Sequence, residues 1–134
     1  MARMDVSKWR VLIVDDEPDS IEVVRLVLTS AGATVYEAHN GQAALESLYR
    51  ERPTVVLADL SMPVMDGWEM LKAIQTSEDS YHPPVIALTA NAMVSDRERV
   101  LAAGFDGYLS KPLRMYTLLE DVTRCLEDVK RGSA

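Results

Sequence analysis

Residues 55–67 decide how the rest of the chain can be arranged. They read Val55-Val56-Leu57-Ala58-Asp59-Leu60-Ser61-Met62-Pro63-Val64-Met65-Asp66-Gly67. The apolar run at 55–58 is too short for a typical helix and is rich in valine and leucine, as strands buried inside parallel sheets are. Such a strand would deliver Asp59 to the sheet edge where α/β proteins bind ligands. Taken alone, Asp59 would be interpreted as a solvated acid or a loop cap, because most acids lie at the surface.

Composition limits the function classes that the chain can serve. Its 134 residues, 48% of them hydrophobic, suit one domain with one core. The net charge of −7 argues against direct nucleic-acid binding, which needs a basic face. The one cysteine, Cys125, cannot form an internal disulfide and fits a small core residue. No signal peptide or membrane-spanning run is visible, so we expect a soluble, cytoplasmic protein without membrane contact.

Five short apolar stretches alternate with five segments of helical periodicity. The stretches lie at 10–14, 33–38, 55–58, 84–88 and 105–109, and the last two helices are expected at 93–103 and 114–130. This alternation predicts βαβ crossovers and an α/β fold with helices on both faces of a parallel sheet. The simplest arrangement is a doubly wound five-stranded parallel sheet of order 2-1-3-4-5, the flavodoxin-like (βα)5 order.

That strand order would bring three carboxylates together, because strands 1 and 3 become neighbours. Asp15 and Asp16 follow the first strand and Asp59 ends the third. Two such charges 4 Å apart repel by about 4 kcal/mol at an effective dielectric constant of 20. A raised pKa or a bound cation relieves this repulsion, and oxygen ligands without histidine or cysteine favour Mg²⁺, with Mn²⁺ as a possible substitute.

Two further side chains are expected at the same edge. Thr89 ends the fourth strand and offers a hydroxyl, and Lys111 follows the fifth and offers an ammonium group. Acids, a hard cation, a hydroxyl and an ammonium group are what positioning a phosphoryl group requires. A carboxylate can itself accept that group as an acyl phosphate, and Asp59 is the best placed to do so.

Four motifs, each at the end of a predicted strand, make the chain resemble the receiver domain of two-component response regulators, of the stand-alone or hybrid-kinase type. They are Val11-Leu12-Ile13-Val14-Asp15-Asp16-Glu17, Asp59-Leu60-Ser61-Met62-Pro63-Val64-Met65-Asp66-Gly67, Ala87-Leu88-Thr89-Ala90 and Gly104-Phe105-Asp106-Gly107-Tyr108-Leu109-Ser110-Lys111-Pro112. The resemblance covers about residues 9–130. It implies a flexible leader at 1–9, a receiver domain at 10–130 and a tail at 131–134.

The resemblance also implies roles for the residues at the strand ends. Asp59 would be the phosphoacceptor, taking its phosphoryl group from a phosphohistidine on a histidine kinase or a histidine phosphotransfer protein. Asp16 and Asp59 would ligate Mg²⁺ through side chains, Ser61 through its backbone carbonyl, and Asp15 indirectly through water. Thr89 and Lys111 would bind the phosphoryl oxygens.

A signalling switch is the function that the resemblance implies. Tyr108 would turn inward as Thr89 moves, and the surface of the fourth helix, fifth strand and fifth helix would change for a downstream protein partner. The Lys111–Pro112 peptide would be cis. Such a protein is no enzyme beyond its own phosphorylation and dephosphorylation. Tyr108 could instead be a packed strand aromatic, and Glu17 either a first-turn helix acid or a group near the metal.

Other functions compete with the switch. A phosphorelay intermediate, or the receiver of a hybrid histidine kinase, would use the same aspartate chemistry. A flavin-binding protein would need a glycine-rich phosphate loop where Asp15-Asp16-Glu17-Pro18 stands, and a haloacid-dehalogenase-type phosphatase would need a second acid where Ser61 stands. Too few of the 134 residues follow the last predicted helix for an output domain, so we expect either a complete single-domain regulator or a receiver cut from a longer chain.

Overall fold

A computed structural model describes residues 5–79, 81–90 and 94–132. Its five parallel strands form one sheet of order β2-β1-β3-β4-β5, which confirms the predicted order and the α/β fold. The strands are β1 (Arg10–Val14), β2 (Thr34–Ala38), β3 (Val55–Asp59), β4 (Val85–Thr89) and β5 (Gly107–Ser110). The five α-helices are α1 (Pro18–Ser30), α2 (Gly41–Glu51), α3 (Gly67–Gln75), α4 (Val94–Ala103) and α5 (Leu118–Gly132).

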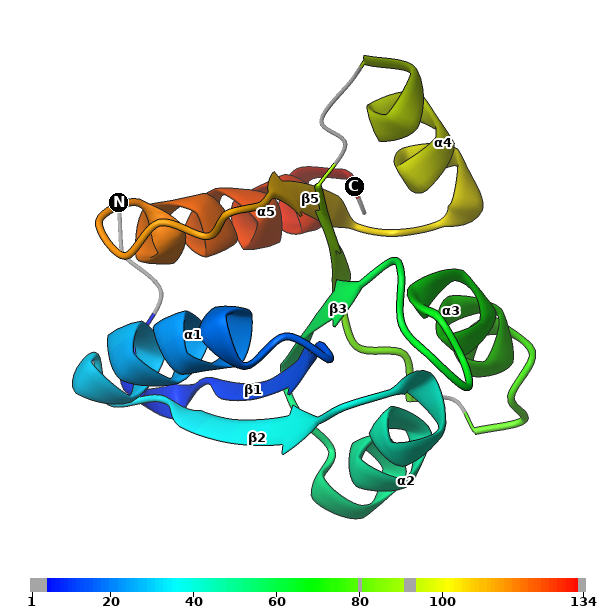
Figure 1. Ribbon diagram of the computed structural model, residues 1–134, viewed down its shortest axis with the longest axis horizontal. Coiled ribbons are helices and arrows are strands. Elements are labelled where there is room, and N and C mark those ends of the chain that lie inside the picture. Colours follow the sequence, from blue (N-terminus) through cyan, green and yellow to red (C-terminus); the bar gives the residue numbers. More distant parts are fainter. Residues whose placement is uncertain (1–4, 80, 91–93, 133–134) are drawn as a thin grey trace.

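Helices cover the sheet on both faces. Figure 1 shows α1 and α5 on one side of the sheet and α2 and α3 on the other. Successive residues of β1 therefore enter different cores: Val11 and Ile13 pack with α1 and α5, whereas Leu12 and Val14 pack with α2, α3 and α4. Every residue of β3 and β4 is buried, as the continuous apolar runs predict.

Local sequence signals fix where the helices begin. Pro18 occupies the first turn of α1, where its missing N–H has no partner to lose. Asn40 caps α2, accepting a hydrogen bond from the Ala43 N–H at 2.8 Å. Asp66 caps α3 in a reciprocal arrangement with Glu69: the Asp66 carboxylate accepts a hydrogen bond from the Glu69 N–H, and the Glu69 carboxylate accepts one from the Asp66 N–H.

Gly67 sets how closely α3 can approach the end of β3. A Cβ atom at this position would lie 2.4 Å from the backbone carbonyl oxygen of Asp59, which cannot move aside without shifting the strand. Only glycine fits this contact. The start of α3 and the strand end that carries Asp59 are therefore held together.

Two elements begin at least two residues later than expected. The fifth strand begins at Gly107 and not at 105, because Phe105 is buried beside the ring of Trp68 on α3, outside the strand ladder. The fifth helix begins at Leu118 and not at 114, because Met115 and Tyr116 are exposed and bury no apolar face there. The expected start of the fourth helix, Met93, lies outside the described residues.

Part of the predicted leader folds onto the domain. Asp5 caps a short 3₁₀ helix, η1 (Val6–Lys8), and Trp9 is buried in the core beneath α1. The Trp9 carbonyl also accepts a hydrogen bond from the Thr34 N–H at 3.0 Å, next to the start of β2. Residues 1–4 of the leader and 133–134 of the tail lie outside the described residues.

Candidate functional site

The strand ends bring the predicted residues to one edge of the sheet. Asp15 directly follows β1, Asp59 is the last residue of β3 and Thr89 is the last residue of β4. Lys111 follows β5. β1 and β3 are hydrogen-bonded neighbours in the register Val14 to Ala58, so the acids that come next along each strand meet at the switch point of the sheet.

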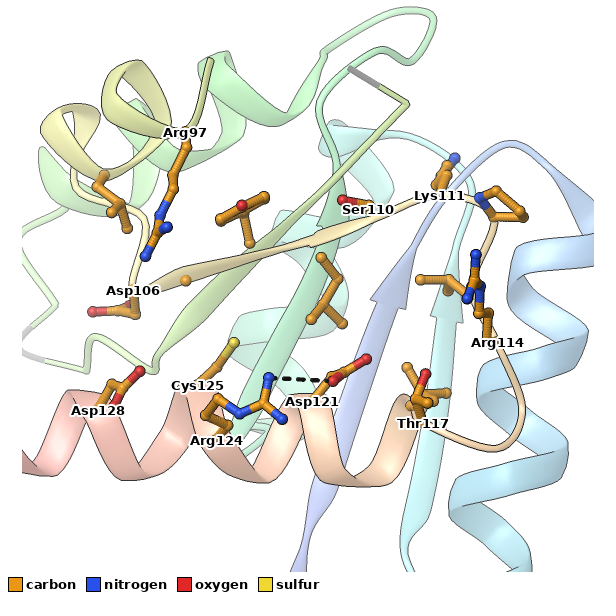
Figure 2. Close-up of a pocket in the computed structure, with 17 residues that line it drawn as sticks. Arg97, Asp106, Ser110, Lys111, Arg114, Thr117, Asp121, Arg124, Cys125 and Asp128 are labelled. Atoms are coloured by element: carbon orange, nitrogen blue, oxygen red, sulfur yellow. Dashed lines mark ion pairs between the residues drawn. The ribbon is translucent and has the colours of Figure 1, made fainter. Parts of the chain in front are cut away.

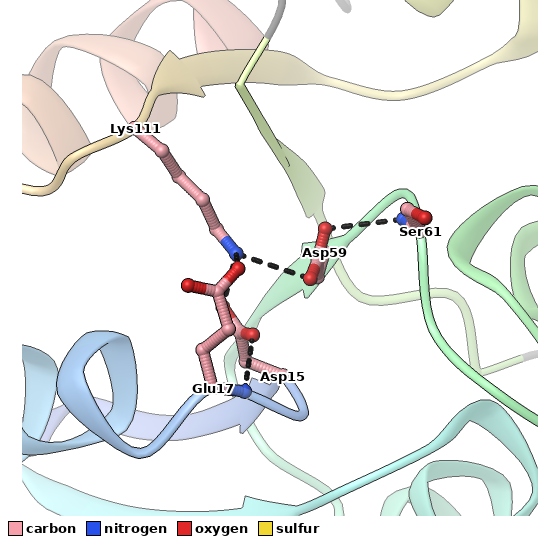
Figure 3. A network of polar contacts seen from close by, with 5 residues as sticks. All are labelled: Asp15, Glu17, Asp59, Ser61 and Lys111. Carbon is pink, nitrogen blue, oxygen red and sulfur yellow. Dashed lines mark hydrogen bonds and ion pairs between the residues drawn. The ribbon is translucent and has the colours of Figure 1, made fainter.

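Lys111 lies at the centre of this group. Its ammonium nitrogen Nζ is 2.9 Å from Asp15 Oδ2, 3.0 Å from Glu17 Oε1 and 3.0 Å from Asp59 Oδ2. Figure 3 shows the lysine reaching across from the end of β5 to these carboxylates. The Lys111 side chain is 9% exposed, and those of Asp15 and Asp59 are 0% and 8% exposed, so these charges are largely removed from water.

The carboxylates are grouped closely enough to hold a metal ion. Asp15, Asp16, Glu17 and Asp59 each offer an oxygen, and these oxygens lie within 4.8 Å of one another. The buried Asp15 Oδ2 is in ion-pair range of Lys111 but accepts no well-directed hydrogen bond from the described part of the chain. An all-oxygen donor set with an incompletely satisfied buried carboxylate fits a hard divalent cation.

Burial raises the pKa of the Asp59 carboxyl, and the neighbouring charge of Asp15 raises it further. The Ser61 N–H, which donates to Asp59 Oδ1 at 3.1 Å, and the Lys111 ammonium oppose this shift without cancelling it. For Lys111, burial alone would lower the pKa, but its three carboxylate partners outweigh burial and raise it. Lys111 is therefore a cation throughout the physiological pH range.

A cavity of about 740 Å³ opens over these groups; we call it the acceptor cavity, after the predicted acceptor Asp59 in its wall. It is lined by Asp16, Asp59, Ser61, Thr89 and Lys111, among others. The structure therefore brings together the predicted acceptor, the hydroxyl, the ammonium group and the predicted metal ligands. Asp16 and Ser61 are exposed and Thr89 is buried at the cavity wall. The sequence left the role of Glu17 open. In the structure, the exposed Glu17 side chain forms an ion pair with the Lys111 ammonium group.

Tyr108 does not line this cavity. It lies half-buried on β5, paired with Ala87 of β4, and its ring is 5.6 Å from the guanidinium carbon of Arg97 on α4. It lines a second cavity of about 580 Å³ between α4, β5 and α5, which Figure 2 shows. The neighbouring Lys111–Pro112 peptide bond is cis, as the resemblance implies.

Two charged residues of the acceptor cavity were missed by sequence reasoning. Asp96 and Arg99 of α4 line it together with Trp68 of α3, and the Arg99 guanidinium carbon lies 5.2 Å from the Trp68 ring centroid. No spacing pattern links residues so far apart in sequence. Trp68 itself is half-buried in the wall of this cavity.

Comparison with known proteins agrees with this geometry. The sequence model of the response regulator receiver domain family matches residues 11–123 of this chain. The chemotaxis response regulator CheY4 of Vibrio cholerae has a similar structure, with a TM-score of 0.80 and 32% identity over 87% of this chain and 98% of that one. The receiver domain of the sensor histidine kinase PA1611 from Pseudomonas aeruginosa PAO1, with magnesium coordinated in its active-site cleft, is also similar. Its TM-score is 0.76, and it is 35% identical over 89% of this chain and 98% of that one.

Longer proteins are similar as well. The sensor histidine kinase GacS of Pseudomonas protegens is 37% identical over 86% of this chain, which spans 13% of that kinase. Within the described residues, no helix is long and apolar enough to cross a membrane. Because the family model covers most of the chain and the fold agrees with it, the chain belongs to the response regulator receiver domain family.

Proposed function

We propose that the chain is a phosphorylation-dependent signalling switch whose phosphoacceptor is Asp59. The observation that carries the proposal is the position of Asp59, which is 5% exposed, ends a buried strand and lies 3.0 Å from the Lys111 ammonium at a cavity wall. A carboxylate oxygen would attack the phosphorus of a phosphohistidine. The O–P bond forms as the P–N bond breaks, and the histidine nitrogen of the kinase or phosphotransfer protein leaves with the electron pair.

The acidic cluster supplies the metal ligands in this proposal. Asp16 and Asp59 would hold Mg²⁺ through their side chains, Ser61 through its carbonyl, and Asp15 through water; Mn²⁺ suits the same oxygens. When bound, the ion would offset the charge of the carboxylates and of the incoming phosphoryl oxygens. The grouped oxygens and the incompletely satisfied Asp15 Oδ2 support this assignment.

Thr89 and Lys111 would hold the phosphoryl group once it has transferred. Phosphorylation adds about 1.5 to 2 negative charges, which attract the Lys111 ammonium and the Thr89 hydroxyl. Both residues already line the cavity. Lys111 has only to exchange one carboxylate partner for a phosphoryl oxygen, since its ammonium nitrogen is 3.0 Å from the acceptor itself.

A movement of Thr89 would be passed to the surface through β4 and β5. Thr89 pairs with Ser110 and Ala87 with Tyr108, so the proposed switch tyrosine lies on the neighbouring strand two residues along. The half-buried Tyr108 could turn inward into space that Thr89 vacates, and the α4–β5–α5 surface would then change for a downstream protein partner. A single phosphoryl group can shift such an equilibrium if the two states differ by a few kcal/mol.

Intact-mass measurement after incubation with Mg²⁺ and acetyl phosphate tests the proposal. We expect one phosphoryl increment in the wild type, none in Asp59→Asn and none in the wild type after Mg²⁺ is chelated. Asp66→Asn is the matched control, because Asp66 lines the same cavity and asparagine can still cap α3. An undiminished increment in Asp59→Asn would show that the acceptor is another residue.

A phosphorelay intermediate is the alternative, and the similarity to GacS and PA1611 favours it because both are sensor histidine kinases. Such a chain would pass its phosphoryl group to a second histidine. Mixing the phosphorylated chain with a histidine phosphotransfer domain distinguishes the two functions. Rapid loss of the phosphoryl mass increment, without a change in the amide NMR signals of α4 and β5 on phosphorylation, supports a relay. A retained mass increment together with a change in those NMR signals supports the switch.

A further inference from the structure

The acceptor cavity is lined mainly by acids. Among the described residues that line it, the carboxylates are Asp16, Glu17, Asp59, Asp66 and Asp96. The cations among them are Lys111 and Arg99. A phosphoryl donor is an anion, and it enters this cavity against the field of the carboxylates. Cations at the cavity mouth therefore decide how readily a donor is admitted.

Lys111 is already occupied by carboxylates. Its ammonium nitrogen lies within 3.0 Å of oxygens from Asp15, Glu17 and Asp59, and its side chain is 9% exposed. Arg99 differs in both respects. Its ion pair with Asp96 is 3.8 Å long, beyond hydrogen-bond distance, and its side chain is 69% exposed. Arg99 can therefore bind an arriving anion without first leaving a buried partner.

Arg99 stacks on the ring of Trp68 in the wall of the acceptor cavity. Its guanidinium carbon lies 5.2 Å from the centroid of the Trp68 ring, within cation–π range. Trp68 packs edge-on against the buried Phe105, with ring centroids 5.5 Å apart and planes at 82°. Trp68 also follows Gly67, where the Asp59 carbonyl oxygen leaves no room for a Cβ atom. The arginine is thus supported by the same short segment that positions the acceptor.

We propose that Arg99 is a donor-positioning residue, which attracts the phosphoryl oxygens of the donor into the cavity and orients them toward Asp59. This inference rests on the proposed function, since it assigns a residue to the same site. The ligand class is a phosphoryl dianion. A small acyl phosphate and a protein phosphohistidine both present that group, and acetyl phosphate is the probe that isolates it from protein–protein contacts.

The rate of phosphorylation by acetyl phosphate, followed by intact mass, tests the role of Arg99. The second-order rate constant should fall about fivefold in Arg99→Gln at low ionic strength, as expected for removing one charge several ångströms from a dianion in water. The difference in rate constant between Arg99→Gln and the wild type should become smaller with added salt, which screens exposed charges. Arg99→Lys should retain most of the rate, because it keeps the charge and can stack on Trp68.

Arg124→Gln is the matched control. Arg124 lies on α5, forms an i,i+3 ion pair with Asp121 at 3.5 Å and is 69% exposed, as Arg99 is. Figure 2 shows this pair beside the second cavity. Arg124→Gln removes the same charge from the protein but not from the acceptor cavity, so its rate constant should stay within about twofold of the wild-type value.

Mg²⁺ affinity, measured by calorimetry without any phosphoryl donor, gives a second readout. It should change in the opposite direction to the phosphorylation rate. Removing a cation from an acidic cavity should make Arg99→Gln bind Mg²⁺ about twofold to threefold more tightly. A variant with a distorted site would bind Mg²⁺ more weakly and react more slowly. Unchanged rate and affinity in Arg99→Gln would overturn the role of Arg99 alone. A wild type that takes no phosphoryl group would overturn the proposed function, and the donor role with it.

Discussion

Replacing Lys111 by methionine should destabilise the protein severely at neutral pH. The substitution keeps an unbranched side chain of similar length and removes the ammonium group that lies 2.9 to 3.0 Å from three carboxylates. Asp15 is 0% exposed, so it cannot regain the water that would solvate its charge, and Asp59, which is 5% exposed at the cavity wall, can regain it only in part. The variant therefore folds only if these carboxylates repel one another inside the domain or take up protons.

The magnitude follows from the burial of each partner. Leaving a buried charge without its partner costs about 3–5 kcal/mol. The contact with Glu17 adds at most about 1 kcal/mol, because that side chain is 61% exposed. The cavity admits water beside Asp59, which places the expected loss near the lower limit, about 3 kcal/mol. For a domain of this size, that corresponds to a lowering of the melting temperature by about 10 °C.

Urea unfolding, followed by tryptophan fluorescence and by far-ultraviolet circular dichroism, measures this loss. The two signals should coincide and the m-value should match the wild type, so that the midpoints report stability. Lys72→Met, at an exposed position on α3, is the control and should change stability by less than about 0.5 kcal/mol. Adding Asp59→Asn to Lys111→Met should restore at least about 1 kcal/mol, because one of the repelling charges is gone.

The pH dependence has a definite sign. Burial raises the pKa of Asp59, so this carboxyl takes up a proton at a higher pH in the folded protein than in the unfolded chain. The destabilisation caused by Lys111→Met should therefore shrink as the pH falls from 7 toward 4. A loss no larger than that of Lys72→Met at pH 7, or one that grows as the pH falls, would refute the view that Lys111 neutralises buried carboxylates.

Three further predictions rest on neighbouring residues. Asp59→Asn should be more stable than the wild type at pH 7. The difference in stability should shrink as the pH falls through the raised Asp59 pKa toward 3.8, because protonation of Asp59 in the wild type removes the same charge. Urea unfolding midpoints at several pH values measure this difference. Asp66→Ala should cost about 1 kcal/mol by removing the cap of α3, whereas Asp66→Asn should lose less, and thermal unfolding compares the two. Gly67→Ala should cost about 1–3 kcal/mol, because its Cβ would lie 2.4 Å from the Asp59 carbonyl oxygen; phosphorylation by acetyl phosphate should also slow, since the strand end must shift.

The sequence predicted the sheet because burial on both faces leaves a local record. Strands such as β3 and β4, buried along their whole length, appear as unbroken apolar runs, and the polar residue that ends each run marks the sheet edge. Once the strand order is chosen, the positions of Asp59, Thr89 and Lys111 follow from topology alone. The sequence is sufficient to group these residues because each lies within two residues of a strand end.

Features that depend on packing between distant segments could not be predicted in this way. Phe105 extended the apolar run of the fifth strand, but its ring is buried beside Trp68, and an apolar residue in a loop has the same signature as one in a strand. Met115 and Tyr116 continued the helical pattern of the last helix, yet both are exposed. Arg99 looked like any surface arginine, because nothing in the sequence shows that Trp68 lies beneath it.

Stability and the proposed chemistry place opposite demands on the same four groups. Lys111 compensates Asp15, Glu17 and Asp59 together, so the resting site has more carboxylates than it has cations to neutralise them. A sequence selected for stability alone would replace Asp59 by a neutral residue, which is why Asp59→Asn is expected to stabilise the fold. Retaining the acid is understandable if its nucleophilic oxygen is used, since functional sites commonly keep groups that destabilise the domain. The excess negative charge would also draw in a divalent cation, and it would make an exposed arginine at the cavity mouth most effective toward an anionic donor.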